Sequence, residues 1–215
     1  MAVKDVVRAF SQIAREYDRW YEKNPLFESE VLAIKALGAL PSPKLEIGVG
    51  SGNFSQALQI DFGLDPSFEM LRLAREKGVK VVCALAEALP WRKGSLGSVL
   101  FLFTFCFLAR PQKALSEAWN ALKPYGNLVL GIINRASPWG AFYQKKAQKG
   151  HPLYRYARFF TAKEVCTLAQ AQGFALKKAF STLFVSPSAT PTVEKPREGL
   201  FKEAGFQVLL FEKEP

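Results

Sequence analysis

A short apolar run that ends in alternating glycines constrains this chain most strongly. It reads KLEIGVGSGN over residues 44–53. The run predicts a buried strand, because Pro43 precedes it and glycine follows it. The glycines predict a turn whose backbone takes positive φ or approaches a neighbour closely. An amphipathic stretch over residues 54–58 follows, so the unit is strand, glycine turn and helix, which is typical of nucleotide-type binding crevices.

The glycine spacing argues against two common nucleotide-binding fingerprints. The dinucleotide fingerprint has a glycine at its sixth place, where this chain has Asn53. A Walker loop continues into Gly-Lys-Ser/Thr, which is absent after this turn. A tight strand-to-helix turn that binds no ligand is the alternative interpretation.

An acid followed by Gly-x-Gly-x-Gly resembles motif I of the class I S-adenosylmethionine (SAM)-dependent methyltransferases. The resemblance implies SAM as the cofactor, with the glycine turn passing under its amino-acid part. It implies cofactor contacts from Gly48, Gly50, Ser51 and Gly52. It also implies that Glu46 orders the turn or takes the amino group of the cofactor.

A second segment, DPSFEML over residues 65–71, resembles the family's Asp-x-Ser-x-x-Met. Asp65 follows the strand expected over 59–64, at the edge where the crevice of a doubly wound sheet lies. A carboxylate there can accept hydrogen bonds from two ribose hydroxyls. The resemblance adds Pro66 to the cofactor site and places Met70 near the adenine edge. Alternatively, Asp65 caps the helix that Pro66 begins.

Two further segments resemble the family more loosely. Residues 84–91 resemble the loop beside the adenine, which implies contacts from Ala86 and Glu87, although Leu85 stands where many relatives carry Asp. Glu87 could instead cap a short helix. Tyr17 lies in a Tyr-Asp-x-Trp segment that folds over the SAM site in the family, at the end of a helix expected over 3–21.

The strand expected over 99–103 ends at Thr104, where substrate meets the methyl group in such folds. This position therefore joins the cofactor-site candidates. Methyltransferases of base amino groups often carry Asn/Asp-Pro-Pro-Tyr/Phe here, and this chain does not. The apolar and aromatic residues after Thr104 indicate a greasy or aromatic substrate, or simply core.

The order of elements predicts an α/β fold. With the motifs, it resembles the class I methyltransferase fold: a doubly wound, Rossmann-like sheet of seven mostly parallel strands, one of them antiparallel, with helices on both faces. Further strands are expected over 79–83, 128–133, 175–185 and 206–211. We expect a single domain over 1–215, with residues 1–40 and 134–160 as lid elements.

Residues 134–160 mix basic and aromatic side chains and follow the fifth strand, so they can cover the substrate side. Such a mixture can bind single-stranded nucleic acid, bind an acidic aromatic metabolite, or form a solvated face above a hydrophobic one. His151, the only histidine, is a possible general base, but a loop histidine without a partner motif is more often incidental.

Composition says more about the compartment and the kind of partner than about the activity. The net charge of +10 allows an anionic partner without choosing one. Three scattered cysteines predict buried thiols in a reducing cytoplasm, with neither disulfides nor a metal site. No run is long and apolar enough to span a bilayer, and the first residues lack the order of a signal peptide.

The resemblance implies methyl transfer from SAM by in-line displacement to a small-molecule acceptor, of the ubiquinone/menaquinone-biosynthesis type. No residue stands out as a catalytic base. Two other functions stay open at this point: an RNA-directed methyltransferase that uses residues 134–160, and a non-catalytic SAM-binding module. A dehydrogenase is a more distant third.

Overall fold

The computed structural model describes residues 3–214 and forms one eight-stranded sheet with the order β3-β2-β1-β4-β5-β8-β6-β7. The strands are β1 (Lys44–Ile47), β2 (Phe62–Asp65), β3 (Lys80–Cys83), β4 (Leu96–Leu102), β5 (Leu122–Ile133), β6 (Phe174–Thr182), β7 (Arg197–Glu198) and β8 (Phe206–Lys213). Strands β1 to β5 run parallel, and β8 pairs antiparallel with both β5 and β6.

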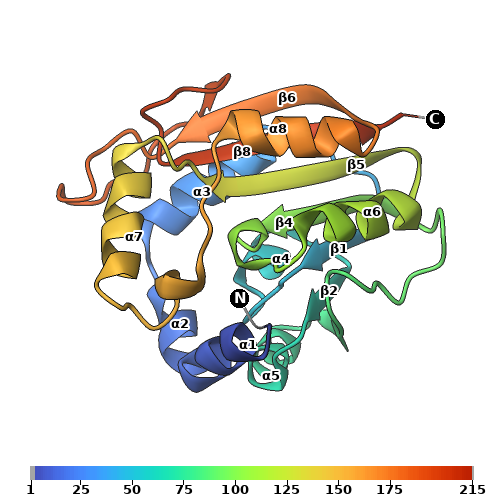
Figure 1. The fold of residues 1–215 in the computed structure, drawn as a ribbon, viewed down its shortest axis with the longest axis horizontal. Helices are drawn as coiled ribbons and strands as arrows, with labels where there is room; N and C mark the ends of the chain where they lie inside the picture. The colour runs from blue at the N-terminus through green and yellow to red at the C-terminus, as the bar shows by residue number, and fades with distance from the viewer. Residues whose placement is uncertain (1–2, 215) are drawn as a thin grey trace.

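Helices cover both faces of this sheet (Figure 1). They are α1 (Val3–Gln12), α2 (Ala14–Trp20), α3 (Pro25–Lys35), α4 (Asn53–Leu58), α5 (Phe68–Glu76), α6 (Pro111–Ala121), α7 (Pro138–Gln148) and α8 (Ala162–Ala171), with short 3₁₀ turns η1 (Phe105–Phe107) and η2 (Tyr154–Tyr156). Helices α6 and α8 pack on one face in a single buried cluster, and α3 and α4 pack on the other. All seven residues of β4 are buried, as a strand covered on both faces requires.

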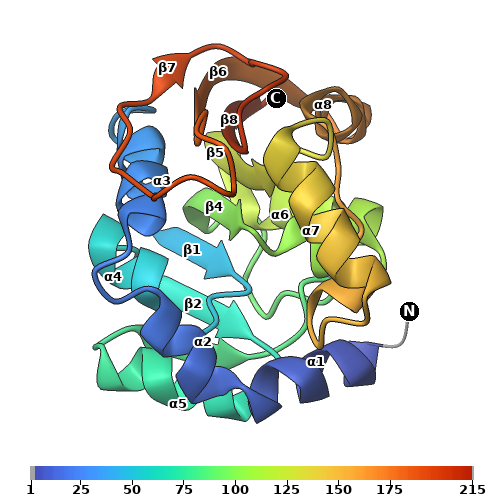
Figure 2. The same cartoon turned by 90° about the vertical axis from the view of Figure 1, so that its left-hand side faces the viewer.

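The strand order reverses next to β1, which pairs in parallel with both β2 and β4. Ile47, at the end of β1, is in register with Leu64 of β2 and Phe101 of β4. The carboxyl ends of the three strands are therefore level. In doubly wound sheets the ligand crevice lies at this point. Figure 2 shows α1 and α2 crossing below these strands and α7 standing to the right of them.

The predicted fold class is confirmed, with one correction to the sheet. The structure has eight strands, and two of them, β7 and β8, run against the others. The additional strand, β7, consists of two residues at the sheet edge paired with β6. Two residues are too few to show the alternation that identifies a strand in a sequence.

The single helix expected over 3–21 is wrong in detail, because Ile13 separates α1 from α2. Its backbone, with φ −113° and ψ 14°, leaves the helical region. The bend lets both short helices pack against α5, where Ala14 joins Met70 and Leu73 in a buried cluster. The apolar stripe predicted one continuous helix, but packing of two shorter helices against α5 decided the local structure.

Several local predictions are confirmed. Asn24 caps α3, its side chain accepting from Leu26 N, and Pro25 occupies the first turn. Thr161 and Glu164 form the capping box of α8. The strand expected over 59–64 begins later, at Phe62, because Gln59 ends α4 in a left-handed conformation.

Candidate functional site

The glycine turn between β1 and α4 is held against the end of β2. Gly48 N and Val49 N both donate to Leu64 O, at 2.7 and 3.0 Å. Gly48 has φ +71°, and a Cβ there would overlap the side chain of Thr104. Glycine is therefore required by both the conformation and the contact.

Asp65 connects this turn to the start of α5. Its Oδ2 accepts from Gly50 N at 3.0 Å, and its Oδ1 accepts from Ser67 N at 2.8 Å. Burial raises the pKa of Asp65 to about 6, although both N–H donors act to lower it. The helix cap itself is Ser67, whose Oγ accepts from Met70 N, so α5 begins at Phe68 and not at Pro66.

A cavity of about 110 Å³ opens beside the turn and Asp65. Eight of the predicted cofactor-site residues line it: Tyr17, Gly48, Gly50, Asp65, Pro66, Ala86, Glu87 and Thr104. Apolar side chains complete its wall, among them Leu85, Phe107 and Leu108, together with Val3, Val6 and Phe10 of α1. We call this space the cofactor cleft.

Glu46 and Ser51 line a much smaller recess behind the turn, of about 20 Å³. Glu46 Oε2 accepts from Ser55 Oγ at 2.6 Å, and burial raises the pKa of Glu46 to about 8. Ser51 Oγ accepts from Asn53 Nδ2 at 2.9 Å, and its carbonyl accepts from the Lys77 ammonium at 2.9 Å. Both predicted residues therefore brace the turn from behind.

Two predicted residues lie outside both spaces. Gly52 is the N-cap residue of α4, and a Cβ there would lie 3.0 Å from Ala74 Cα, so this glycine permits α4 to approach α5. Met70 is 1% exposed and packs against Ala14 and Leu73. Their motif positions serve packing in this chain.

Glu87 combines a place in the cleft with a structural contact. Its Oε1 accepts from Arg110 N at 3.2 Å, at the residue that begins α6. The side chain thus anchors a later helix, which is a different role from the local cap considered in the sequence. Leu85 remains 38% exposed at the mouth of the cleft.

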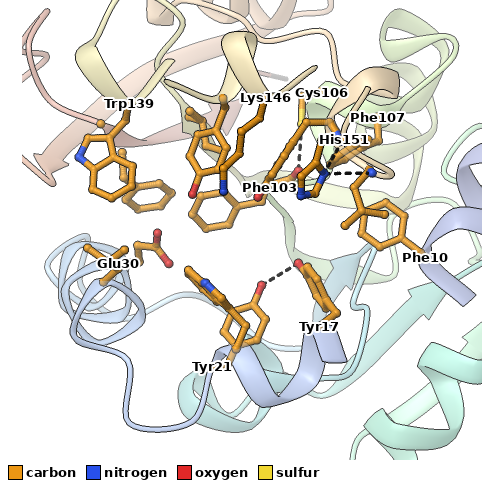
Figure 3. A pocket seen from close by; sticks show the side chains of 18 of the residues that line it. Phe10, Tyr17, Tyr21, Glu30, Phe103, Cys106, Phe107, Trp139, Lys146 and His151 are labelled. Carbon is orange, nitrogen blue, oxygen red and sulfur yellow. Dashed lines mark hydrogen bonds between the residues drawn. The ribbon is translucent and has the colours of Figure 1, made fainter. Parts of the chain in front are cut away.

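A second, larger cavity of about 240 Å³ adjoins the cofactor cleft (Figure 3). Its wall comes from α1, α2, α3, η1, α7, the loop before η2 and the start of β8. Most of the wall is aromatic or aliphatic: Phe10, Trp20, Tyr21, Phe103, Phe107, Trp139, Tyr143, Tyr154 and Phe206 are examples. We call this space the aromatic cavity.

The two spaces share four lining residues, Phe10, Tyr17, Phe103 and Phe107. Tyr17 Oη lies 2.7 Å from Tyr21 Oη, and burial raises the pKa of both hydroxyls above the ordinary value of tyrosine. Phe103 has φ +60°, a conformation rare for a bulky residue, and its ring stacks between Phe54 and Phe206. Such local strain is typical of functional sites.

His151 lines the aromatic cavity, and its Nδ1 accepts from the backbone N–H groups of Leu153 and Tyr154, at 3.3 and 3.4 Å. Burial and the nearby Lys146 lower its pKa below the usual value for histidine. These contacts give His151 a structural role in shaping the loop before η2.

Comparisons with known proteins identify the family. The Methyltransferase domain model matches residues 45–130. A Thermotoga maritima SAM-dependent methyltransferase, a possible histamine N-methyltransferase, is 36% identical in sequence to this chain. Its crystal structure matches the fold with a TM-score of 0.90, covering 97% of this chain and 100% of that one. This chain belongs to the class I SAM-dependent methyltransferases.

Two further proteins, one bacterial and one archaeal, are similar to this chain over most of its length. An uncharacterised Mycobacterium tuberculosis protein is 39% identical over 90% of this chain and 70% of its own length. An uncharacterised Methanocaldococcus jannaschii protein is 36% identical over 96% of this chain and 100% of its own length.

The methyltransferase is an enzyme that uses SAM as its methyl donor, so the non-catalytic and dehydrogenase alternatives are set aside. Among residues 3–214, no helix is long and apolar enough to cross a membrane.

The sequence interpretation considered Tyr17 and His151 and expected residues 134–160 on the substrate side, but it missed Glu30. Glu30 of α3 is 4% exposed and lines this cavity, and Lys146 of α7 lines it as well. Glu30 did carry a signal, since it stands four residues from both Leu26 and Ile34, within the apolar stripe of its helix. A lone acid in such a stripe is a candidate for a buried functional group.

Proposed function

We propose that this methyltransferase transfers the methyl group of SAM to a small-molecule acceptor with an apolar or aromatic body, which binds in the aromatic cavity. The observation that carries the proposal is the shared wall of the two spaces at Phe10, Tyr17, Phe103 and Phe107. These residues line both spaces, so an acceptor in the one would lie next to a cofactor in the other.

The cofactor would bind through the residues that line the cleft. Gly48 and Gly50 present backbone without side chains, which leaves room for a ligand to lie against the turn. Each oxygen of Asp65 has accepted one backbone N–H, so each retains a lone pair for a ribose hydroxyl. Ala86, Leu85 and Phe107 offer the apolar surface that an adenine ring requires. These features fit SAM.

We propose that residues 1–40 and 134–160 act as lids on the site. The first contributes Tyr17 and Tyr21 to the cavity wall, and the second contributes Trp139 and Tyr143. Both segments would exclude water and hold the acceptor in line with the methyl group. SAM supplies an electrophilic methyl carbon, so alignment in a dry pocket can account for about 7–11 kcal/mol of the barrier. No base is assigned.

The aromatic side chains of residues 134–160 speak against single-stranded RNA as the acceptor. Trp139 is 6% exposed, and Tyr143 and Tyr154 line the cavity. A stacking platform for bases needs exposed rings between basic side chains. The aromatic side chains of residues 134–160 are all buried or half-buried, so they do not form an exposed platform of this kind.

A panel assay tests the proposal. The purified protein would be incubated with SAM and with phenols, quinols, catechols and aromatic amines, including histamine, and release of S-adenosylhomocysteine would be measured. We expect turnover with at least one aromatic acceptor and none with short RNA. Turnover with RNA alone, weakening steeply with salt, would contradict the small-molecule assignment.

A further inference from the structure

Glu30 is a buried carboxyl group that nothing in the fold explains. It projects from α3 into the aromatic cavity, with Trp139 and Tyr21 on either side (Figure 3). Its Oε2 is buried and has no hydrogen-bond partner among the described residues. The ion pairs within residues 3–214 use other acids, namely Asp18, Glu117, Glu164 and Glu212.

Burial raises the pKa of Glu30 well above the ordinary value of a glutamate, and no neighbouring cation opposes that effect. The neutral, protonated form of the carboxyl group is therefore favoured over the carboxylate until a positive charge lies beside it. An apolar side chain at this position would avoid the cost of an unpartnered buried polar group. A ligand that pairs with the carboxylate would supply the partner that Glu30 lacks and would account for an acid at this position.

The surroundings of Glu30 suit a positive charge. Faces of aromatic rings attract ammonium groups, and Trp139, Tyr21 and Tyr143 line the same cavity. Lys146 is already accommodated in this way, its Nζ lying 4.6 Å from the Phe142 ring centroid and 5.9 Å from that of Tyr143. The other titratable groups that line the cavity are Glu16, Tyr17, Tyr21, Tyr143, Tyr154, Cys106 and His151.

None of these groups supplies a counter-charge to Glu30 at neutral pH. Burial raises the pKa of the tyrosines and raises that of Cys106 to about 12, so their hydroxyl and thiol groups stay neutral. Burial and Lys146 lower the pKa of His151, which keeps its ring neutral as well. Lys146, the cation of this cavity, lies over the Phe142 and Tyr143 rings and forms no ion pair with Glu30. Among the described residues the carboxyl group therefore has no cationic partner, and a ligand can provide one.

We propose that Glu30 is a specificity-determining residue for an acceptor that carries a protonated amine on an apolar body. The ammonium group would pair with the Glu30 carboxylate between Trp139 and Tyr21, and the methylated atom would lie at the other end of the molecule, near Tyr17 and Phe103. The inference rests on the proposed function, because it assigns a substrate class to the same cavity. On binding, a carboxyl group that still carries its proton releases it to solvent, and the ammonium keeps all of its own.

Calorimetry with three matched probes tests this assignment. The protein saturated with S-adenosylhomocysteine would be titrated with 2-phenylethylamine, its trimethylammonium analogue and the neutral 2-phenylethanol. We expect both cations to bind at least tenfold more tightly than the alcohol. Repeating the titrations at several pH values, in buffers of different ionisation enthalpy, should give proton release on binding of each cation, and this release should decrease as the pH is raised through the pKa of Glu30. The trimethylammonium probe has no proton to lose, so this release must come from the protein.

Two variants distinguish a specific contribution of Glu30 to cation binding from the effect of removing any negative charge from α3. Glu30→Gln should weaken binding of both cations at least tenfold, abolish the proton release and leave the affinity for 2-phenylethanol within twofold. Glu28→Gln is the matched control, because Glu28 lies on the same helix but is exposed, and it should leave all three affinities within twofold. The SAM affinity of each variant, measured in parallel, reports on its folding.

The inference is overturned if neither cation binds more tightly than the alcohol, if no proton is released, or if Glu30→Gln binds the cations as the unaltered protein does. An acceptor panel in which only neutral phenols are methylated would remove the cation site and leave the proposed function standing. A panel in which no small molecule is methylated would remove the proposed function itself.

Discussion

The cofactor cleft and the aromatic cavity share a wall, yet they are built in opposite ways. The cleft depends on backbone: Gly48, Gly50 and Asp65 lie within one strand-turn-helix unit and the strand beside it. The cavity depends on side chains from segments as distant in sequence as Phe10 and Phe206. A backbone site tolerates few substitutions but serves one ligand in a whole family, whereas a side-chain cavity can change its substrate by changing single residues.

The largest effect is expected at the backbone site. Gly48→Ala would place a Cβ against Thr104 and force alanine to φ +71°. We expect the free energy of unfolding to fall by about 2–4 kcal/mol, from backbone strain and overpacking together, and SAM binding to be lost. Denaturant unfolding and calorimetry measure the two. Gly38→Ala, at φ +97° with nothing within 4 Å of its Cβ, is the control for strain alone; equal losses in both variants would refute the role given to the Thr104 contact.

The cavity should respond in the opposite direction. Glu30→Met replaces an unpartnered buried acid with an apolar chain of similar length, so the free energy of unfolding should rise by about 1–3 kcal/mol. Acceptor turnover should fall at the same time. Thermal and denaturant unfolding at pH 7 measure the first, and S-adenosylhomocysteine release measures the second. A less stable variant would show that Glu30 has a structural partner in solution and would weaken the contrast between the two regions.

Asp65→Asn tests whether the negative charge of Asp65 contributes to SAM binding in the cleft. We expect SAM binding to weaken at least tenfold, about 1.4 kcal/mol, because the amide keeps only one acceptor oxygen. Asp61→Asn is the control, since Asp61 is exposed and accepts from Lys44 N at the far end of β2. Calorimetry that finds equal affinities for the two variants would leave Asp65 with a structural role only.

The pH dependence of this site follows from the raised pKa of Asp65, about 6 in the folded protein against 3.8 for an unperturbed aspartate. The folded state keeps a proton that the unfolded state has released, so the contribution of Asp65 to stability falls as pH rises from about 4 through 6. SAM affinity should rise over the upper part of that range, as the carboxylate forms. Asp65→Asn should lack this rise.

The smallest effect is expected at the wall between the two spaces. Tyr17→Phe removes a hydroxyl that lies 2.7 Å from Tyr21 Oη and keeps the ring that lines both cavities. One hydrogen bond is worth about 0.5–1.5 kcal/mol, so we expect KM for SAM and for the acceptor each to change by up to about tenfold. Steady-state kinetics measure both. Tyr125→Phe, at an exposed tyrosine, is the control, and an effect on only one of the two KM values would place Tyr17 in one space.

The sequence alone determined the glycine turn and the acid beside it, because these features are local. The Gly-x-Gly-x-Gly turn, the acid at the end of the second strand, and the caps at Asn24 and Thr161 each depend on residues a few positions apart. Steric limits on backbone and short-range hydrogen bonds act within such segments, so their residue types can be interpreted without the fold. The parallel sheet followed from the same alternation of strands and helices.

Only the tertiary structure decided the aromatic cavity. It bent the first helix at Ile13, turned Trp139 and Tyr143 inward, and buried Glu30 in a cavity bounded by segments far apart in the chain. It also gave Gly52 and Met70 packing roles that their motif positions did not indicate. Burial and desolvation depend on which distant surfaces meet, and neither residue type nor spacing along the chain specifies that.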